Sequence, residues 1–409
     1  MALTGRASRR RSLRHLSCVA HGSRNGRARL SSPGGCWPTP HQESLLKAAL
    51  LSGPEAQKAW TAWRDQVTDL TTLDHASVRL LPLLHANLTR LGVSDPWAPV
   101  LRGAYRKAWY TNRVLLHALE KVVRALEGAG VPTMALKGSA LVAAVYSDVG
   151  LRPMNDIDLL VHPGDLDTTV GALAELGFRP YHGGQRIDHD RLSTVNAAAF
   201  VDPRGHVLDL HWHVLRDSCG PDADGDFWAR AVPTRIGSAT TSRLGPSDQL
   251  IHIISHGVRW NPVPPFRWVA DAFALTNSAE IDWTCLLATS RTHGTELHAL
   301  SGLRYLARTF PNMVPPEVIA ELARTEVEPW RRREFKAQTR PASEPRRLAI
   351  HWYRHRRNSG ARSWLRRLLS FPEYLRSYFG LDSALQIPRF VLRDLPRLRG
   401  TRARREQSH

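Results

Sequence analysis

Two aspartates at the start of an apolar run constrain this chain more than any other feature of its sequence. Asp156 and Asp158 open the segment Asp-Ile-Asp-Leu-Leu-Val, which is rich in residues that favour β-strands. In a strand, residues two apart point to the same face and lie about 7 Å apart. Both carboxylates can therefore bind a divalent cation from one side of a sheet.

A glycine–serine turn lies a short distance upstream of the two aspartates. Gly138 and Ser139 follow an apolar segment, 131–136, that predicts a strand, and residues 139–146 predict a helix. Backbone N–H groups at such a turn bind phosphate oxygens. Together with the carboxylates, this turn indicates metal-dependent nucleotidyl transfer.

Downstream of the aspartates, the pattern predicts further elements of one mixed α/β unit. These are a strand, a helix closed by a glycine, and a β-hairpin with a turn at 202–205: 156–162, 165–176, and 197–201 with 206–214. We expect this unit to occupy residues 131–240.

The second strand of the hairpin has one apolar and one polar face. Asp209, His211 and His213 alternate with apolar residues and share the polar face. If this strand lies beside 156–161, Asp209 joins Asp156 and Asp158 as a third carboxylate. Such a cluster predicts a site for two Mg²⁺ ions. We expect the two histidines to line a substrate pocket, because Cys and His partners at zinc spacing are missing.

Two basic residues flank the turn and the aspartates. Lys137 is either an ordinary lysine at a strand end or a phosphate ligand. Arg152 is either a surface arginine or an anchor for phosphate.

Charge is concentrated at the two ends of this 409-residue chain. The net charge of +19 divides into +8 in residues 1–40 and +15 in 331–409, which leaves −4 between them. Residues 1–40 lack periodicity and predict a disordered basic tail. Residues 41–130 and 241–330 carry helical patterns, such as 44–51, 78–84 and 112–126. The Arg-rich tail 331–409 includes stretches that predict amphipathic helices.

Several classes of protein are disfavoured by composition. No apolar run approaches the roughly 20 residues needed to span a bilayer, and the basic N-terminus lacks the apolar stretch of a signal peptide. The four cysteines have no CxxC spacing, which argues against a zinc site or a disulfide framework. These features favour a cytoplasmic protein.

In its ordered motifs, the chain resembles the polymerase-β-type nucleotidyltransferase superfamily, and within it a bacterial family of uncharacterised nucleotidyltransferases. The matching segments are Leu136-Lys137-Gly138, Arg152 with 156–161, 209–212, His256-Gly257, and Trp268 with Asp271. The spacing from Ser139 to Asp156 is longer than in minimal members of the superfamily. The resemblance implies an α+β fold, with a mixed-sheet core flanked by helical regions.

The resemblance also implies an activity. Asp156, Asp158 and Asp209 would hold Mg²⁺, and Lys137, Gly138, Ser139 and Arg152 would hold ATP or another NTP. A nucleoside monophosphate would pass to a small molecule, a peptide natural product, a protein or an RNA end.

Three alternatives remain open at this point. The first is a non-catalytic scaffold that binds nucleic acid through its basic tails. The second is a toxin-like enzyme that modifies tRNA. The third is a protein attached to a membrane surface by amphipathic helices of its tail.

Overall fold

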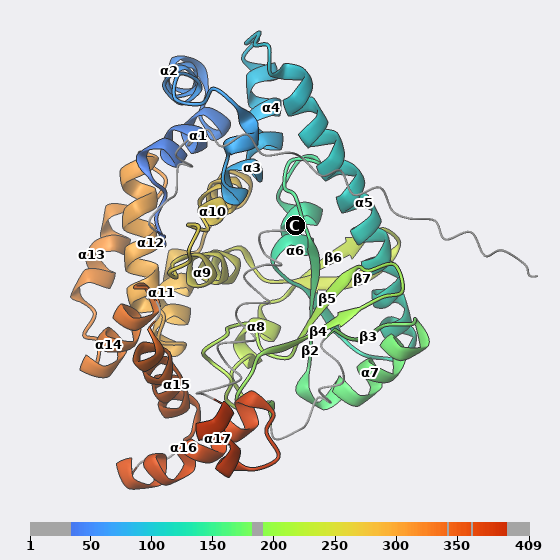
Figure 1. The fold of residues 1–409 in the computed structure, drawn as a ribbon, viewed down its shortest axis with the longest axis vertical. Coiled ribbons are helices and arrows are strands. Elements are labelled where there is room, and N and C mark those ends of the chain that lie inside the picture. Colours follow the sequence, from blue (N-terminus) through green and yellow to red (C-terminus); the bar gives the residue numbers. More distant parts are fainter. Residues whose placement is uncertain (1–33, 182–190, 342, 361–362, 391–409) are drawn as a thin grey trace, which may run out of the picture.

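The computed structural model describes residues 34–181, 191–341, 343–360 and 363–390. A β-sheet with its own helices forms one half of the molecule, and a group of helices from both ends of the chain forms the other (Figure 1). The predicted tail 1–40 falls mostly outside the described residues.

The helices before the sheet pack as a compact group that leads into one long helix. They are α1 (Pro40–Leu50), α2 (Gly53–Arg64), the 3₁₀ turn η1 (Leu70–Thr72), α3 (His75–Val78), α4 (Leu81–Arg90) and α5 (Ala98–Gly128). The predicted helix 78–84 is interrupted, because Pro82 lies in the first turn of α4, where its missing N–H costs no hydrogen bond. The predicted helix 112–126 is the C-terminal half of α5.

Seven strands form one mixed sheet in the order β3-β4-β5-β2-β1-β7-β6. The strands are β1 (Thr133–Ala135), β2 (Asp156–Val161), β3 (Arg179–Pro180), β4 (Ala197–Val201), β5 (Val207–His211), β6 (Val232–Ile236) and β7 (Ala239–Arg243). β2 pairs with β5 in parallel and with β1 antiparallel. β4 and β5 form the predicted hairpin. The α+β class is confirmed. Strands form at the predicted places, but β5 ends at His211 instead of 214, and β3, β6 and β7 were not predicted.

Alternation along the two central strands separates a core face from a site face. Ile157, Leu159 and Leu208 belong to a core that the second half of α5 shares with the sheet. Asp158 and Asp209 point to the opposite face. The remaining helices of the sheet half are short: α6 (Lys137–Ala144), η2 (Pro163–Asp165), α7 (Leu166–Glu175) and α8 (Gly225–Ala229).

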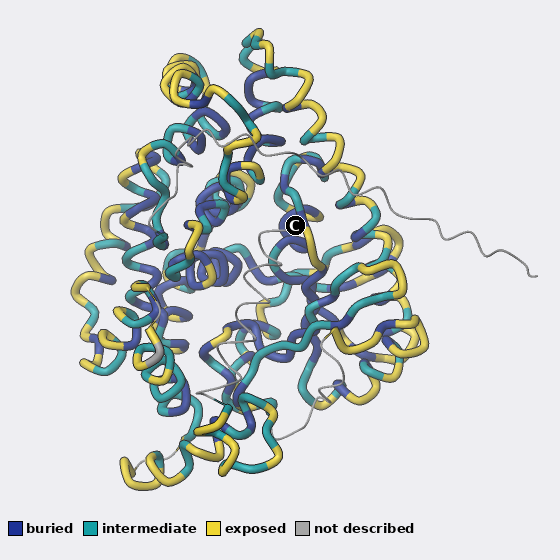
Figure 2. The backbone as a smooth tube through the Cα atoms, in the orientation of Figure 1, coloured by how far each residue is buried: buried dark blue, intermediate teal, exposed yellow. Residues whose placement is uncertain are grey.

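The helices after the sheet pack against those before it. Leu45 and Leu84 from the N-terminal helices share one hydrophobic core with Leu250 and Leu303 from the later ones. These later helices are α9 (Pro246–Gly257), α10 (Arg267–Ser278), α11 (Trp283–Thr292), α12 (Glu296–Thr309) and α13 (Pro316–Arg324). In Figure 2, α9 lies among the most deeply buried segments, between this helical half and the sheet.

The Arg-rich C-terminal region also folds against the helical half. Its elements are α14 (Pro329–Gln338), α15 (Glu344–Asn358), α16 (Trp364–Phe379), η4 (Ala384–Gln386) and α17 (Ile387–Arg389). Helices were predicted here, but Arg354 is 3% exposed and is therefore part of the packed protein, unlike a residue of a solvated tail. None of the described helices is both long enough and apolar enough to cross a membrane.

Candidate active site

The two central strands bring the predicted carboxylates together. Asp158 of β2 lies directly opposite Asp209 of β5, as expected if the two strands are neighbours. Oxygens of these carboxylates and an imidazole nitrogen of His211 all lie within 4.8 Å of one another. Asp156, two residues before Asp158, is the first residue of β2 and lies outside this closest group.

Lys137 is the cation that this cluster holds. Its Nζ lies 2.7 Å from Oδ1 of Asp158 and 3.4 Å from Nε2 of His211. The same Oδ1 lies 3.1 Å from Nε2 of His211. Lys137 has a φ of +43°, in the left-handed region that side chains rarely adopt. A costly backbone conformation at the first residue of α6 is typical of a functional position.

The pKa shifts follow from a surplus of negative charge. Burial raises the pKa of Asp158, but Lys137 and a hydrogen bond from His211 outweigh it and hold that pKa well below the usual range. Burial and then the charge of Asp158 raise the pKa of both Asp209 and Asp156. Burial acts to lower the pKa of Lys137, yet the neighbouring carboxylates raise it. The positive charge of Lys137 therefore interacts with all three carboxylates.

This donor set fits a hard divalent cation. Two carboxylates and one imidazole converge at one place, and the cluster has more negative than positive charge. Oxygen-rich sites of this kind suit Mg²⁺ or Mn²⁺. The expected ligands Asp158 and Asp209 meet here, and His211 joins them although it was predicted only to line a pocket.

The turn before α6 has two structural features. A Cβ on Gly138 would lie 2.6 Å from Nη1 of Arg152, so glycine is required for close packing at this position. The side chain of Ser139 is fully buried, and its hydroxyl has no partner among the described residues. Only the backbone N–H groups of this turn are therefore suited to the phosphate contact predicted for it.

Arg152 is neither on the surface nor free for a ligand. It is 4% exposed, and its Nε and Nη2 donate to the two carboxylate oxygens of Asp271 at 2.7 and 2.9 Å. Tyr146 donates to the same carboxylate at 2.8 Å. Although burial opposes both shifts, the pairing raises the pKa of Arg152 and lowers that of Asp271. The arginine thus fastens the segment before β2 to helix α10.

The two histidines of the β5 strand separate at its end. His211 is the last residue of β5, and its Nδ1 lies 3.3 Å from the amide nitrogen of Asn196. His213 lies beyond the strand and contacts Asp224 at 2.6 Å and the carbonyl oxygen of Leu192 at 3.0 Å. Both of its ring nitrogens are engaged within the protein, and of the two histidines only His211 lines the cavity beside the carboxylates.

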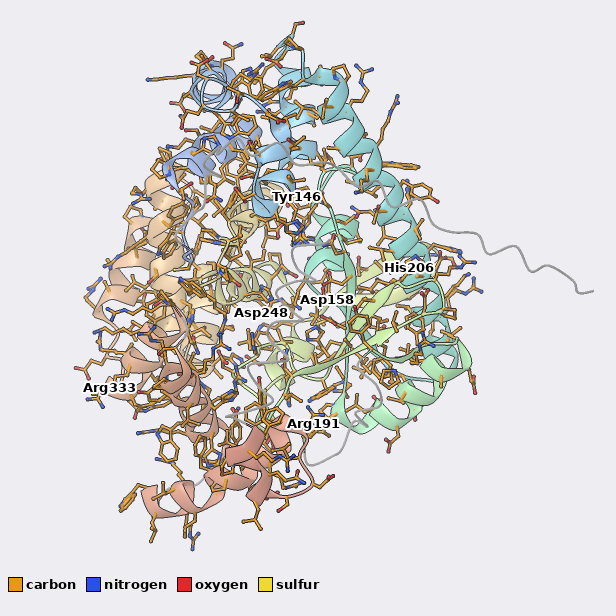
Figure 3. All side chains as sticks on the ribbon, in the orientation of Figure 1. Tyr146, Asp158, Arg191, His206, Asp248 and Arg333 are labelled. Atoms are coloured by element: carbon orange, nitrogen blue, oxygen red, sulfur yellow. The ribbon has the colours of Figure 1, made fainter. Side chains whose placement is uncertain are left out.

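Two histidines that were not predicted as site residues also face the cluster. A cavity of about 540 Å³ is lined by Lys137, Asp209 and His211 on the sheet side, and by His252 and His256 of α9 on the helical side. Figure 3 places Asp158 where the sheet half meets the helical half. The i, i+4 spacing of the two histidines was the available signal, since it puts both on one helix face.

Two arginines from distant segments act on Asp156. The charges of Arg267 and Arg79 lower the pKa of Asp156, against its burial and the charge of Asp158. Burial and neighbouring arginines bring the pKa of Arg267 down to about 9. No local sequence pattern marks these arginines, because they reach the site from α10 and from the end of α3.

Packing explains the motifs of the later helices. A Cβ on Gly257 would overlap the indole of Trp268, so this glycine lets α9 and α10 approach closely. Asp271 follows Trp268 by three residues and anchors Arg152. The segments around His256-Gly257 and Trp268-Asp271 therefore hold α9 and α10 together and attach α10 to the segment before β2.

A mixed sheet with two carboxylates on adjacent strands, after a turn that opens a helix, defines a nucleotidyltransferase-type protein. The chain matches the family described as "Uncharacterised nucleotidyltransferase" over residues 70–311 and belongs to that family. No curated protein matches the chain. A similar solved structure is an antigenic nucleotidyltransferase-like protein from Paracoccidioides brasiliensis, with 17% identity. That likeness covers 50% of this chain and 92% of the other, at a TM-score of 0.34.

Proposed function

We propose that this protein transfers a nucleoside monophosphate from an NTP to an acceptor hydroxyl and releases pyrophosphate. The family supports a nucleotidyl transfer role in general terms. The observation that carries the proposal is the facing pair Asp158 and Asp209 on adjacent strands, with Lys137 in an ion pair with Asp158. A surplus of buried carboxylates is costly unless a cation balances it.

Asp158 and Asp209, with Asp156 or His211 beside them, would hold Mg²⁺. Bound Mg²⁺ would supply charge neutralisation to the phosphates and would polarise the attacked phosphorus. Asp209 is suited to accept the proton of the acceptor hydroxyl, because burial and Asp158 raise its pKa toward the working range of a base.

The start of α6 would bind the triphosphate. The backbone N–H groups of Gly138 and Ser139 lie in the first turn of this eight-residue helix, where orphan donors and the helix dipole favour an anion. Lys137, held at 2.7 Å from Asp158, is within reach of the same place. Arg152 has a positioning role in this proposal, since Asp271 occupies its guanidinium.

The test is transfer of label from each α-labelled NTP, with Mg²⁺ and a cell extract as the source of acceptor. We expect labelled product and pyrophosphate with the wild type and neither with the double variant Asp156→Ala/Asp158→Ala. Asp222→Asn, an exposed aspartate in the loop before α8, is the control. Equal transfer by wild type and double variant would refute the proposal.

The scaffold alternative makes a different use of the basic C-terminal region. Arg354 and Arg357 of that region donate to Asp217 and Glu334 within the protein. These two arginines are therefore engaged internally, which favours a part in a small-molecule site over non-specific contact with nucleic acid. A steep loss of DNA or RNA binding with salt would instead support the scaffold.

A further inference from the structure

The cavity beside the carboxylates continues into a basic region that the proposed chemistry does not use. Arg340, after α14, is among the residues that line it, together with four more arginines: Arg216 in the loop after β5, Arg259 after α9, and Arg354 and Arg357 of α15. We call these four residues the arginine wall. Arg216 follows Asp209 by seven residues, so the strand that carries a catalytic carboxylate leads directly into this wall.

Carboxylates within the protein neutralise only part of this wall. Asp217 accepts hydrogen bonds from Arg354 at 2.9 and 3.0 Å and also pairs with Arg259. Gln338 donates to the same carboxylate at 3.1 Å. Glu334 pairs with Arg357. Two carboxylates therefore face four arginines.

Arg216 is the arginine that is left over. In the described part of the chain no carboxylate forms an ion pair with it, and its side chain has a hydrogen bond with the hydroxyl of Tyr378. Its side chain is exposed to the cavity.

Two of the histidines that line the cavity, His252 and His298, do not change this balance. His252 and His298 are buried, and burial lowers the pKa of each to about 3. At neutral pH both are uncharged and offer one donor and one acceptor each. The wall is thus a rigid cationic surface with neutral hydrogen-bonding groups beside it.

We propose that the arginine wall binds a phosphate group of the acceptor, so that the second substrate is a small phosphorylated molecule with a free hydroxyl. Guanidinium groups match phosphate oxygens in pairs, and a dianion would balance the two surplus cations. A cavity of about 540 Å³ lies within the roughly 300–1,000 Å³ of small-molecule sites. This inference rests on the proposed transfer for the word acceptor, but the anion site itself does not depend on it.

This assignment gives the C-terminal helices a role in substrate choice. The family match ends at residue 311, whereas Arg354, Arg357 and Tyr378 come from α15 and α16. The cavity is therefore closed by a part of the chain outside the matched region. The phosphate contact would be a feature of this chain's own extension.

The experiment is titration of the full-length protein with inorganic phosphate, followed by calorimetry and by ³¹P line broadening. Binding is measured in the presence of a saturating non-hydrolysable NTP, so that phosphate does not report on the turn before α6. Arg216→Gln removes the surplus cation without breaking an internal ion pair. Arg333→Gln is the matched control, because Arg333 is exposed on the outer side of α14 (Figure 3).

We expect wild type and Arg333→Gln to bind phosphate alike, and Arg216→Gln to bind it at least about 10-fold more weakly, the scale of one charged hydrogen bond. Equal binding by all three proteins would overturn the inference. So would a loss of Mg²⁺–NTP affinity in Arg216→Gln of the same size, because the wall would then belong to the nucleotide.

Two further measurements separate this inference from the proposed function. The variant Asp158→Asn should lose transfer and keep the phosphate affinity of the wild type. If no NTP supports transfer but phosphate binding still depends on Arg216, the proposed reaction fails and the anion site stands. If transfer occurs and Arg216→Gln leaves phosphate binding unchanged, the reaction stands and the anion site fails.

Discussion

Two charge clusters of the molecule differ in how their charges balance. In the carboxylate site, made of Asp156, Asp158, Asp209, Lys137 and His211, Lys137 pairs with Asp158 and its charge also acts on Asp209, whereas Arg79 and Arg267 act on Asp156. In the Arg152 pair, Asp271 meets Arg152 through two parallel hydrogen bonds and also accepts from Tyr146.

Burial of a charged group therefore does not by itself identify a catalytic residue. We call the Arg152 pair closed, because the charge of Asp271 is balanced by Arg152 and no further cation is needed to neutralise it. The carboxylate site is open, because its facing pair, Asp158 and Asp209, has two carboxylates and one neighbouring ammonium, Lys137. We expect function to depend on the open cluster and stability to depend on the closed one.

The largest effect is expected from Asp158→Asn. Transfer should fall by about 10³-fold or more, the scale of losing one preorganised electrostatic contact with a transition state. The fold should survive, because Asp209 and Asp156 still attract Lys137. Steady-state kinetics and urea unfolding on the same preparation would measure both. Full activity in this variant would mean that the open cluster is not the reaction centre.

Arg152→Met should have the opposite profile. It leaves the carboxylate of Asp271 buried without its cation, which costs about 3–5 kcal/mol in the free energy of unfolding. Urea denaturation measures the loss. The double variant Arg152→Met/Asp271→Leu should recover part of it, since an apolar pair of similar volume replaces the charges.

The variant Arg152→Met also tests whether Arg152 binds phosphate. An anchor would give weaker Mg²⁺–NTP binding with unchanged stability. That result would contradict the closed character of the pair.

His211 and His213, two residues apart near the end of β5, are expected to differ in the same way. His213→Ala should destabilise the fold by about 2–3 kcal/mol, because Asp224 and the Leu192 carbonyl lose their buried partner. His211→Ala should mainly lower transfer. Parallel unfolding and activity measurements would test this division, and a reversal of the two profiles would refute it.

Local patterns predicted much of the carboxylate site. The strand formers after Asp156, the hairpin turn at 202–205 and the alternation around Asp209 are all short-range features, and β2 and β5 formed as expected. Asp209 could therefore be assigned to the same face as Asp158 before its neighbour was known.

What escaped prediction depends on contacts between distant segments. Arg152 and Asp271 are 119 residues apart, and no local pattern indicates that they pair. His213 left the site face because β5 ends at His211, where Asp224 accepts a hydrogen bond from the Val214 N–H. Arg354 has a basic, tail-like sequence around it, and only the fold shows that it pairs with Asp217.

Asp209→Asn should have the smallest effect on the free energy of unfolding. The direction of that change distinguishes the open cluster from the closed one. Because the folded-state pKa of Asp209 is raised, ionisation is harder in the folded protein than in the unfolded chain. The wild type therefore loses stability as pH rises through the usual carboxyl range and beyond it. In buffer with a chelator at pH 7, the variant should be equal to the wild type or more stable by up to about 1 kcal/mol.

Addition of Mg²⁺ should reverse this order. A cation that binds the folded wild type stabilises it by mass action, whereas the variant has lost one ligand and should respond less. Thermal unfolding with and without Mg²⁺ would give both numbers. For the closed cluster, Asp271→Asn should be less stable than the wild type in either buffer. If Asp209→Asn is also less stable in the chelator, the carboxylate site is balanced without a metal, and the distinction between open and closed clusters fails.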